Sequence, residues 1–225
     1  MLATKVGYGI DGQRDWTASR VPAGVDEALR LTCTEHIDIV HLHSCELPTL
    51  LAGEAVDALD RAQALGKIGL VAYSGENEAL AWSVASGRFG GIEGSVNLFD
   101  QGSLGGPLAL AAGHGLGVIA KRPLAYDTAG LTWNELALRF SAFQPGVSAA
   151  IVGTASVEHL RHNVRLAQKG PLPGADGRCL ARALRRPGRR LAWRGVRPRG
   201  GAAFGADAQV LVLVFTGQPT QGCER

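Results

Sequence analysis

The chain has 225 residues, of which 46% are hydrophobic and 19% charged, and its formal net charge is +3. This length suffices for one ordinary domain with a sizeable core, and the composition is that of a globular protein. No run of eighteen apolar residues occurs, which argues against a membrane span, and the first segment, MLATKVGYGIDG, lacks the pattern of a signal peptide.

Charge is unevenly distributed along the chain. Residues 174–225 contain ten of the 23 basic residues, all of them arginine, and three of the 20 acidic ones. Residues 1–173 therefore carry 13 basic and 17 acidic groups. This asymmetry predicts two parts of different character, 1–173 and 174–225.

Short apolar segments alternate with helical patterns through residues 1–173. The apolar segments are rich in Val, Ile, Leu or Ala, as strands covered on both faces must be, and they predict strands over 2–7, 37–44, 67–74, 91–99, 115–124 and 147–156. Apolar residues three and four apart predict helices over 52–65, 77–88, 131–140 and 156–168. Ser156, with Thr154 before it, is the expected start of the last helix, because its hydroxyl can accept from free backbone N–H groups.

Repeated β/α units imply a parallel sheet, either doubly wound or closed into a barrel. An open dinucleotide-binding sheet usually carries G-x-G-x-x-G after its first strand, and the sequence has none. A closed barrel needs eight strands, and the pattern predicts six.

The segment 174–225 is rich in Arg, Gly, Ala and Pro and has no clear period, apart from an apolar stretch at 208–217. Such a composition cannot bury a core, so we predict a poorly ordered tail. Ten arginines and Trp193 would suit contacts with nucleic acid, but no known nucleic-acid motif is present, and we do not expect nucleic acid as a partner.

The cysteines fit neither a C-x-x-C pair nor a zinc pattern. We therefore expect unpaired thiols in a cytoplasmic protein and no metal site, with the cysteines at Cys33, Cys45, Cys179 and Cys223.

Two polar residues stand near the ends of predicted strands, where a β/α barrel places its active site. Lys5 ends the first strand; taken alone, it is equally explained by a lysine whose stem packs there while its amine reaches water. His43 ends the second and shares a face with His41, although a single strand histidine is more often structural. As a pair, Lys5 and His43 suit polarisation of a carbonyl oxygen.

A further strand ends at Gly153 and Thr154, directly before a predicted helix. Free N–H groups at the start of such a helix favour an anion such as a cofactor phosphate, although an ordinary capped helix explains the same pattern.

The chain resembles the aldo-keto reductases in six segments that occur in the same order and spacing: ATKVGYG, IDIVHLHS, GKIGLVAYSGENEAL, SVNLFDQ, GLGVIAKRPLA and AAIVGTASVEHLRHNV. The resemblance covers about residues 2–173. It implies an α/β fold of the TIM-type (β/α)8 barrel, incomplete, with about six of its eight units. It also implies reduction of an aldehyde or ketone with NADPH and without a metal.

Family members use a tyrosine as proton donor together with an aspartate, a lysine and a histidine. Lys5 matches the lysine and His43 the histidine, whereas the tyrosine and aspartate precede the lysine in the family and have no counterpart here. Tyr8, Tyr73 and Tyr126 match no catalytic position. We expect that the start was placed at an internal codon and that the tail after residue 173 is an out-of-frame reading; the nucleotide sequence upstream and in the other frames tests both.

The resemblance also implies residues that hold the cofactor. Ser74 matches a serine that contacts the nicotinamide, Gly75 stands where many members have Asn, and Glu93 stands where the family commonly has Gln. The remaining matches lie along the cofactor phosphates, with His159 in place of an arginine that reads the 2′-phosphate: Lys121, Arg122, Pro123, Leu124, Gly153, Thr154, His159 and Asn163. NADPH is therefore the expected cofactor, with NADH as an alternative.

The sequence thus predicts a carbonyl reductase acting on a small substrate, with its activity in doubt because the tyrosine and aspartate are missing. The alternative is a catalytically inactive chain that binds the cofactor or a partner protein. The sequence indicates neither the substrate nor the oligomeric state.

Overall fold

The computed structural model describes residues 1–8, 14–124, 131–154 and 156–172. These residues fall into two compact units, the first from residues 1–95 and 102–119 and the second from the described parts of 96–101 and 120–225. The predicted tail, 174–225, lies outside the described residues.

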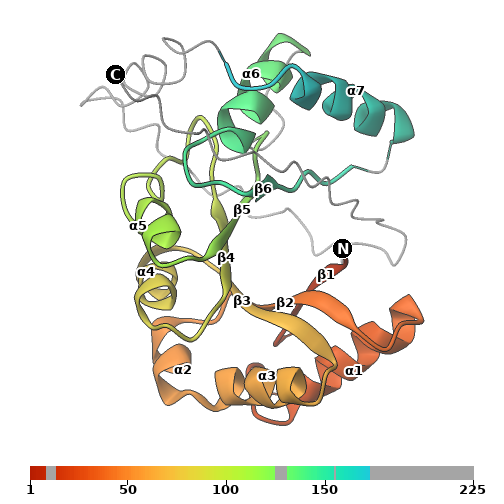
Figure 1. Cartoon of the computed structure of the whole chain (residues 1–225), viewed down its shortest axis with the longest axis vertical. Helices are drawn as coiled ribbons and strands as arrows, with labels where there is room; N and C mark the ends of the chain where they lie inside the picture. The colour runs from red at the N-terminus through yellow and green to blue at the C-terminus, as the bar shows by residue number, and fades with distance from the viewer. Residues whose placement is uncertain (9–13, 125–130, 155, 173–225) are drawn as a thin grey trace. The chain divides into compact units, whose positions relative to one another are not determined.

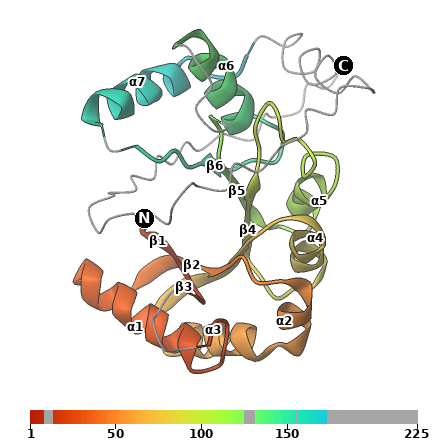
Figure 2. The same ribbon diagram turned by 180° about the vertical axis from the view of Figure 1, so that it is seen from behind.

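Unit 1 begins with three strands and three helices. In chain order these elements are β1 (Ala3–Val6), α1 (Arg20–Thr32), β2 (Ile37–His43), α2 (Leu47–Ala52), α3 (Glu54–Ala64) and β3 (Ile68–Ser74). They are followed by α4 (Asn77–Ala85), β4 (Gly91–Ser95) and α5 (Pro107–Gly113). Figures 1 and 2 show α1 and α3 along one face of β1–β3.

The strand β5 (Gly117–Lys121) has its first three residues in unit 1 and its last two in unit 2. The other elements of unit 2 are α6 (Leu131–Ala142), β6 (Ala149–Ala150) and α7 (Val157–Gln168). The helices α6 and α7 lie side by side (Figures 1 and 2).

The strands follow one another in the order β1-β2-β3-β4-β5-β6. The pairs β1–β2, β2–β3 and β3–β4 are parallel, with Lys5 opposite His41, His43 opposite Ser74, and Ser74 opposite Glu93. Consecutive parallel strands joined by helices are the arrangement of a β/α barrel. The fold is therefore α/β, an incomplete barrel of this type, as the resemblance implies.

The core of unit 1 forms because both faces of the central strands are covered. Val40 and Leu42 of β2 are fully buried, and α1 contributes Val21 and Val25, one turn apart on its inner face. In unit 2, a smaller cluster joins Leu138, Val152 and Leu166, and Leu124 packs against it.

All six predicted strands are present, although most are shorter than predicted and the last comprises only Ala149–Ala150. The helix predicted over 52–65 is present as α3, and Gly53, with a φ of +80°, separates it from α2. The helices α1, α2 and α5 are additional elements that the pattern did not predict. Ser156 caps α7 as predicted, its hydroxyl accepting from the His159 N–H at 3.3 Å. Within the described part of the chain, no helix has the length and apolar character needed to cross a membrane.

Candidate active site

Lys5 and Glu93 form an ion pair from two strands that are not neighbours in the sheet. The Lys5 Nζ lies 2.8 Å from Oε1 of Glu93. Glu93 is 2% exposed and Lys5 26% exposed, so the carboxylate is removed from water while the amine retains some access to it. A buried carboxylate needs such a partner, because its desolvation is otherwise too costly.

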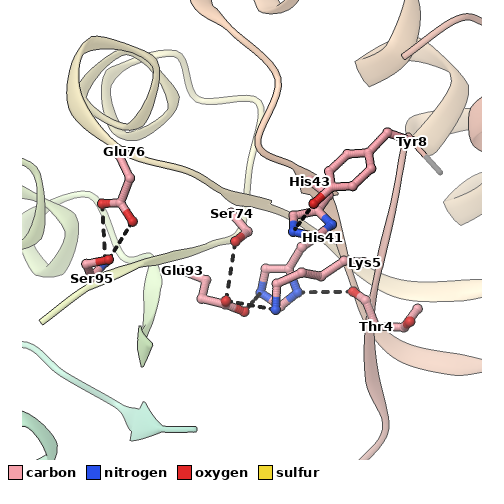
Figure 3. Close-up of polar contacts among 9 residues, drawn as sticks. All are labelled: Thr4, Lys5, Tyr8, His41, His43, Ser74, Glu76, Glu93 and Ser95. Atoms are coloured by element: carbon pink, nitrogen blue, oxygen red, sulfur yellow. Dashed lines mark hydrogen bonds and ion pairs between the residues drawn. The ribbon is translucent and has the colours of Figure 1, made fainter. Parts of the chain in front are cut away.

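Two further residues complete the surroundings of Glu93. The Ser74 hydroxyl donates to Oε1 at 3.3 Å, and Nε2 of His41 lies 3.8 Å from Oε2. The His41 Nδ1 is 3.2 Å from the Thr4 carbonyl, which can only accept, so this nitrogen carries the proton. Figure 3 shows these side chains converging, and we call Lys5, His41, Ser74 and Glu93 the polar cluster.

His43 pairs with a tyrosine at the carboxyl ends of β1 and β2. The Tyr8 hydroxyl lies 3.1 Å from Nε2 of His43, and the two rings are stacked with their centroids 4.4 Å apart (Figure 3). Tyr8 is 43% exposed. A phenol bonded to an imidazole is a suitable proton-transfer pair.

Trp16 holds this pair in place from a third direction. Its indole N–H donates to the His43 carbonyl at 2.8 Å, and its ring meets Tyr8 edge-on at 5.9 Å. Its backbone N–H donates to the Gly7 carbonyl. Gly7 has a φ of +129°, and a Cβ there would lie 2.7 Å from the Trp16 ring, so the turn that presents Tyr8 requires glycine.

Tyr73, by contrast, is a buried structural residue. Its ring is 1% exposed and its hydroxyl donates to the Cys45 carbonyl at 2.7 Å. Burial raises the pKa of Tyr73 above its ordinary value and raises the pKa of the Cys45 thiol to about 12. Neither group therefore ionises at neutral pH.

Close packing against Tyr73 explains why position 75 is a glycine. A Cβ at position 75 would collide with the Tyr73 hydroxyl and ring. The backbone N–H of Gly75 donates to the Glu93 carbonyl at 3.1 Å, which continues the pairing of β3 with β4. The asparagine that many aldo-keto reductases have at this position would collide with Tyr73.

Glu76 forms a second polar contact in unit 1, which is partly buried. Its carboxylate accepts from the Ser95 hydroxyl at 2.6 Å and from the Ser95 N–H at 3.3 Å (Figure 3). This contact ties the start of α4 to the end of β4 and so supports the strand that carries Glu93.

In unit 2, the predicted phosphate loop follows β5. Lys121 is 9% exposed, Arg122 is exposed, and Arg122 has a φ of +56°, a conformation in which non-glycine residues are uncommon. The Pro123 carbonyl accepts from the Ser141 hydroxyl at 3.2 Å, and Leu124 packs into the cluster described above. The loop is thus anchored to α6 at its far end.

The predicted adenosine-phosphate segment runs from β6 into α7. Thr154 accepts from the Ser156 N–H at 3.1 Å, and Gly153 and His159 are exposed at this end of the helix. Asn163 is buried, at 4% exposure. Backbone N–H groups at the start of a helix suit an anion, so the chemistry of this segment fits a cofactor phosphate.

The structure brings together Lys5, Ser74 and Glu93 of the predicted residues, and it joins His43 to Tyr8 instead of to this cluster. His41, Tyr8 and Trp16 were not among the predicted site residues. For His41 the alternation of β2 was a usable signal, whereas only the fold brings Trp16 to His43. Across the described residues, no group of His, Cys, Asp or Glu side chains is suited to hold a metal.

Comparison with known proteins gives a consistent result, although no model of a protein family matches the chain. L-galactose dehydrogenase from Arabidopsis thaliana is 23% identical over 231 residues, covering 86% of this chain and 72% of that protein. The crystal structure of an aldo-keto reductase, PA4992, from Pseudomonas aeruginosa is 28% identical with a TM-score of 0.65 and covers 74% of this chain.

This chain spans 66% of the Pseudomonas structure's length. The aldo-keto reductase AKR11C1 from Bacillus halodurans superposes with a TM-score of 0.68 at 21% identity, over 81% of this chain and 72% of that one, and so supports the fold. With six strands in barrel order and the Lys5 and His43 motifs near strand ends, the chain is similar to aldo-keto reductases in both sequence and fold.

Proposed function

We propose that this protein reduces an aldehyde or ketone to an alcohol with NADPH as the hydride donor. The observation that carries the proposal is the ion pair of Lys5 with Glu93, close to strand ends at which His43 also lies. In β/α barrels this end of the strands is where active sites are built.

The chain's own residues would act on the carbonyl oxygen of the substrate. Lys5 offers a fixed positive charge whose position is set by Glu93, and His43 offers a hydrogen-bonding nitrogen beside Tyr8. Such groups stabilise the negative charge that grows on the oxygen as the carbonyl is reduced. The cofactor, when bound, supplies the hydride to the carbonyl carbon.

We propose that Ser74, Gly75 and Glu93 support the nicotinamide end. Cation-bearing and helix-terminal residues would hold the phosphates, as their donor chemistry suits: Lys121, Arg122, Pro123, Leu124, Gly153, Thr154, His159 and Asn163. Because His159 stands where an arginine would read a 2′-phosphate, both NADPH and NADH belong in the test.

The test uses the full chain. Fluorescence titration measures binding of NADPH and NADH, and loss of cofactor absorbance with a panel of aldehydes and ketones measures turnover. We expect Lys5→Met to lower turnover by about 10²-fold with little effect on cofactor binding. The matched control is Lys67→Met. Lys67 directly precedes β3 and pairs with Asp26, so it lies at the end of β3 opposite to Ser74.

Cofactor binding without turnover of any carbonyl would contradict this proposal. It would instead support the alternative of a cofactor-binding protein without catalytic activity.

A further inference from the structure

We infer that Glu76 is a positioning residue for the cofactor site. By accepting hydrogen bonds from Ser95, it fixes the turn between β3 and α4 to the end of β4 and so sets the place of Ser74. The inference rests on the proposed function, in which Ser74 supports the nicotinamide end of the cofactor. Glu76 itself is not among the residues to which the family resemblance gives a role.

The turn formed by residues 74–77 has a conformation that depends on its surroundings. Asn77 has a φ of +53°, a left-handed conformation in which residues other than glycine are uncommon. Gly75 lies so close to Tyr73 that a Cβ would collide with its hydroxyl and ring. A backbone of this kind costs free energy and persists only where neighbouring groups hold it.

Three residues of the turn hold it against β4. The Gly75 N–H donates to the Glu93 carbonyl at 3.1 Å, and the Ser74 hydroxyl donates to the Glu93 carboxylate at 3.3 Å. The Glu76 carboxylate accepts from the Ser95 hydroxyl at 2.6 Å and from the Ser95 N–H at 3.3 Å (Figure 3). The turn is thus fixed both where it leaves β3 and where it enters α4.

The contact with Ser95 is the stronger of the two serine–carboxylate contacts. Its hydroxyl lies 2.6 Å from Glu76, whereas the Ser74 hydroxyl lies 3.3 Å from Glu93. Ser95 is 0% exposed, so water does not compete for its hydroxyl. A short hydrogen bond to a carboxylate is roughly twice as strong as one between neutral groups.

Ser95 also lies where it can control the cofactor site. It follows Glu93 by two residues in β4, so both side chains lie on the same face of the strand. Figure 3 shows the Glu76–Ser95 contact beside the Ser74–Glu93 contact. Loss of the first contact would free the turn from β4 directly after Ser74 and leave Ser74 less well ordered. Glu76 therefore acts on the cofactor through Ser74, without touching it.

The experiment measures cofactor affinity and stability in the full chain for Glu76→Ala, Ser95→Ala and the double variant. Fluorescence titration with NADPH gives Kd, and thermal unfolding without cofactor gives Tm. We expect each single variant to bind NADPH about tenfold more weakly, because a turn that is no longer preorganised must be ordered on binding. The double variant should bind no more weakly than either single variant, since either substitution breaks the same contact.

Two controls separate positioning from a merely structural role. Glu76→Gln keeps a side-chain oxygen that can accept from the Ser95 hydroxyl, and it should recover part of the lost affinity. Glu78→Ala removes an exposed carboxylate from the first turn of the same helix and should leave Kd unchanged. A lowered Tm with unchanged Kd, or losses of affinity that add in the double variant, would overturn the inference. Ser95→Ala provides this test even where Glu76→Ala fails to fold.

Failure of the proposed function gives a different result. A wild-type chain that binds neither NADPH nor NADH would overturn the proposed cofactor site and the inference with it. Binding without turnover of any carbonyl would contradict the proposed reduction but not the inference, because the inference is read from Kd. Wild-type binding that Glu76→Ala and Ser95→Ala retain at full strength would overturn the inference alone.

Discussion

At the scale of single residues, the site depends on charges and rings placed where water is scarce. Glu93, at 2% exposure, is tolerated because Lys5, Ser74 and His41 surround its oxygens. Replacing one member of a buried pair leaves the other without a partner, which is the costly outcome. Replacing both members removes the charge altogether.

A double-mutant cycle of Lys5→Met and Glu93→Gln tests this ion pair. We expect each single variant to be destabilised by less than the roughly 3–5 kcal/mol of a fully buried pair, because Lys5 is 26% exposed. The double variant should lose less than the two single losses combined, by about 0.5–3 kcal/mol. Urea unfolding measures the free energies, and strict additivity would contradict a direct interaction.

Gly75→Ala tests the packing of Tyr73. The new Cβ would collide with the Tyr73 hydroxyl, which would have to leave the Cys45 carbonyl. We expect a loss of about 1–3 kcal/mol in unfolding free energy. Gly113→Ala is the matched control, since a Cβ there meets nothing within 4 Å; equal stability of the two variants would show that Tyr73 does not limit position 75.

At the scale of elements, local sequence decides where helices start and stop, and ion pairs join helices that the fold brings together. Glu135 of α6 accepts from Arg139 at 2.6 Å and from Lys169, which follows α7, at 2.7 Å. Arg139 also donates to the carbonyls of Gly170 and Pro171. These contacts fasten the end of α7 to α6.

Hydrogen bonds from Lys169 and then Arg139 hold the pKa of Glu135 below its ordinary value. Its stabilising contribution is therefore present above the ordinary glutamate pKa and is lost as the pH falls through the lowered value. We expect Glu135→Gln to lower Tm at neutral pH by a small amount, because the side chain is 33% exposed and water weakens its ion pairs.

The Tm difference between Glu135→Gln and wild type should shrink in acid, as thermal unfolding followed by circular dichroism would measure. Glu35→Gln, an exposed glutamate between α1 and β2, is the control and should change little at either pH. A Tm difference that persists unchanged at low pH would contradict the assignment to ionised Glu135.

At the scale of the whole molecule, the fold follows from repeated parallel pairing. The strands β2 and β3 are each paired on both sides, whereas β1 pairs with β2 within the described residues. The backbone hydrogen bonds of a strand that is paired on both sides and covered on both faces break only when the surrounding structure opens.

We therefore expect the amides of β2 and β3 to exchange with deuterium most slowly. Peptides from β1 should exchange faster, because its hydrogen bonds are made to one neighbour among the described strands. Hydrogen exchange followed by mass spectrometry measures this order. Slower exchange in β1 than in β2 would contradict the proposed pattern of protection.

The sequence by itself determined the fold class, because six apolar strands with amphipathic helices between them leave few arrangements that bury every apolar face. It also determined the candidates Lys5 and His43, whose places near strand ends can be read from alternation alone. Helix bounds were less certain: α3 starts after Gly53, two residues later than the pattern indicates, and the short α5 carries too few residues to show a period.

Only the tertiary structure decided which residues meet. Glu93 lies 88 positions after Lys5 and three strands away in the sheet order, so no local pattern pairs them. The same holds for Trp16 and the His43 carbonyl, and for the space at Gly75 that Tyr73 occupies. Such contacts depend on the register of neighbouring strands and on how side chains fill the space between them, and both are properties of the folded chain.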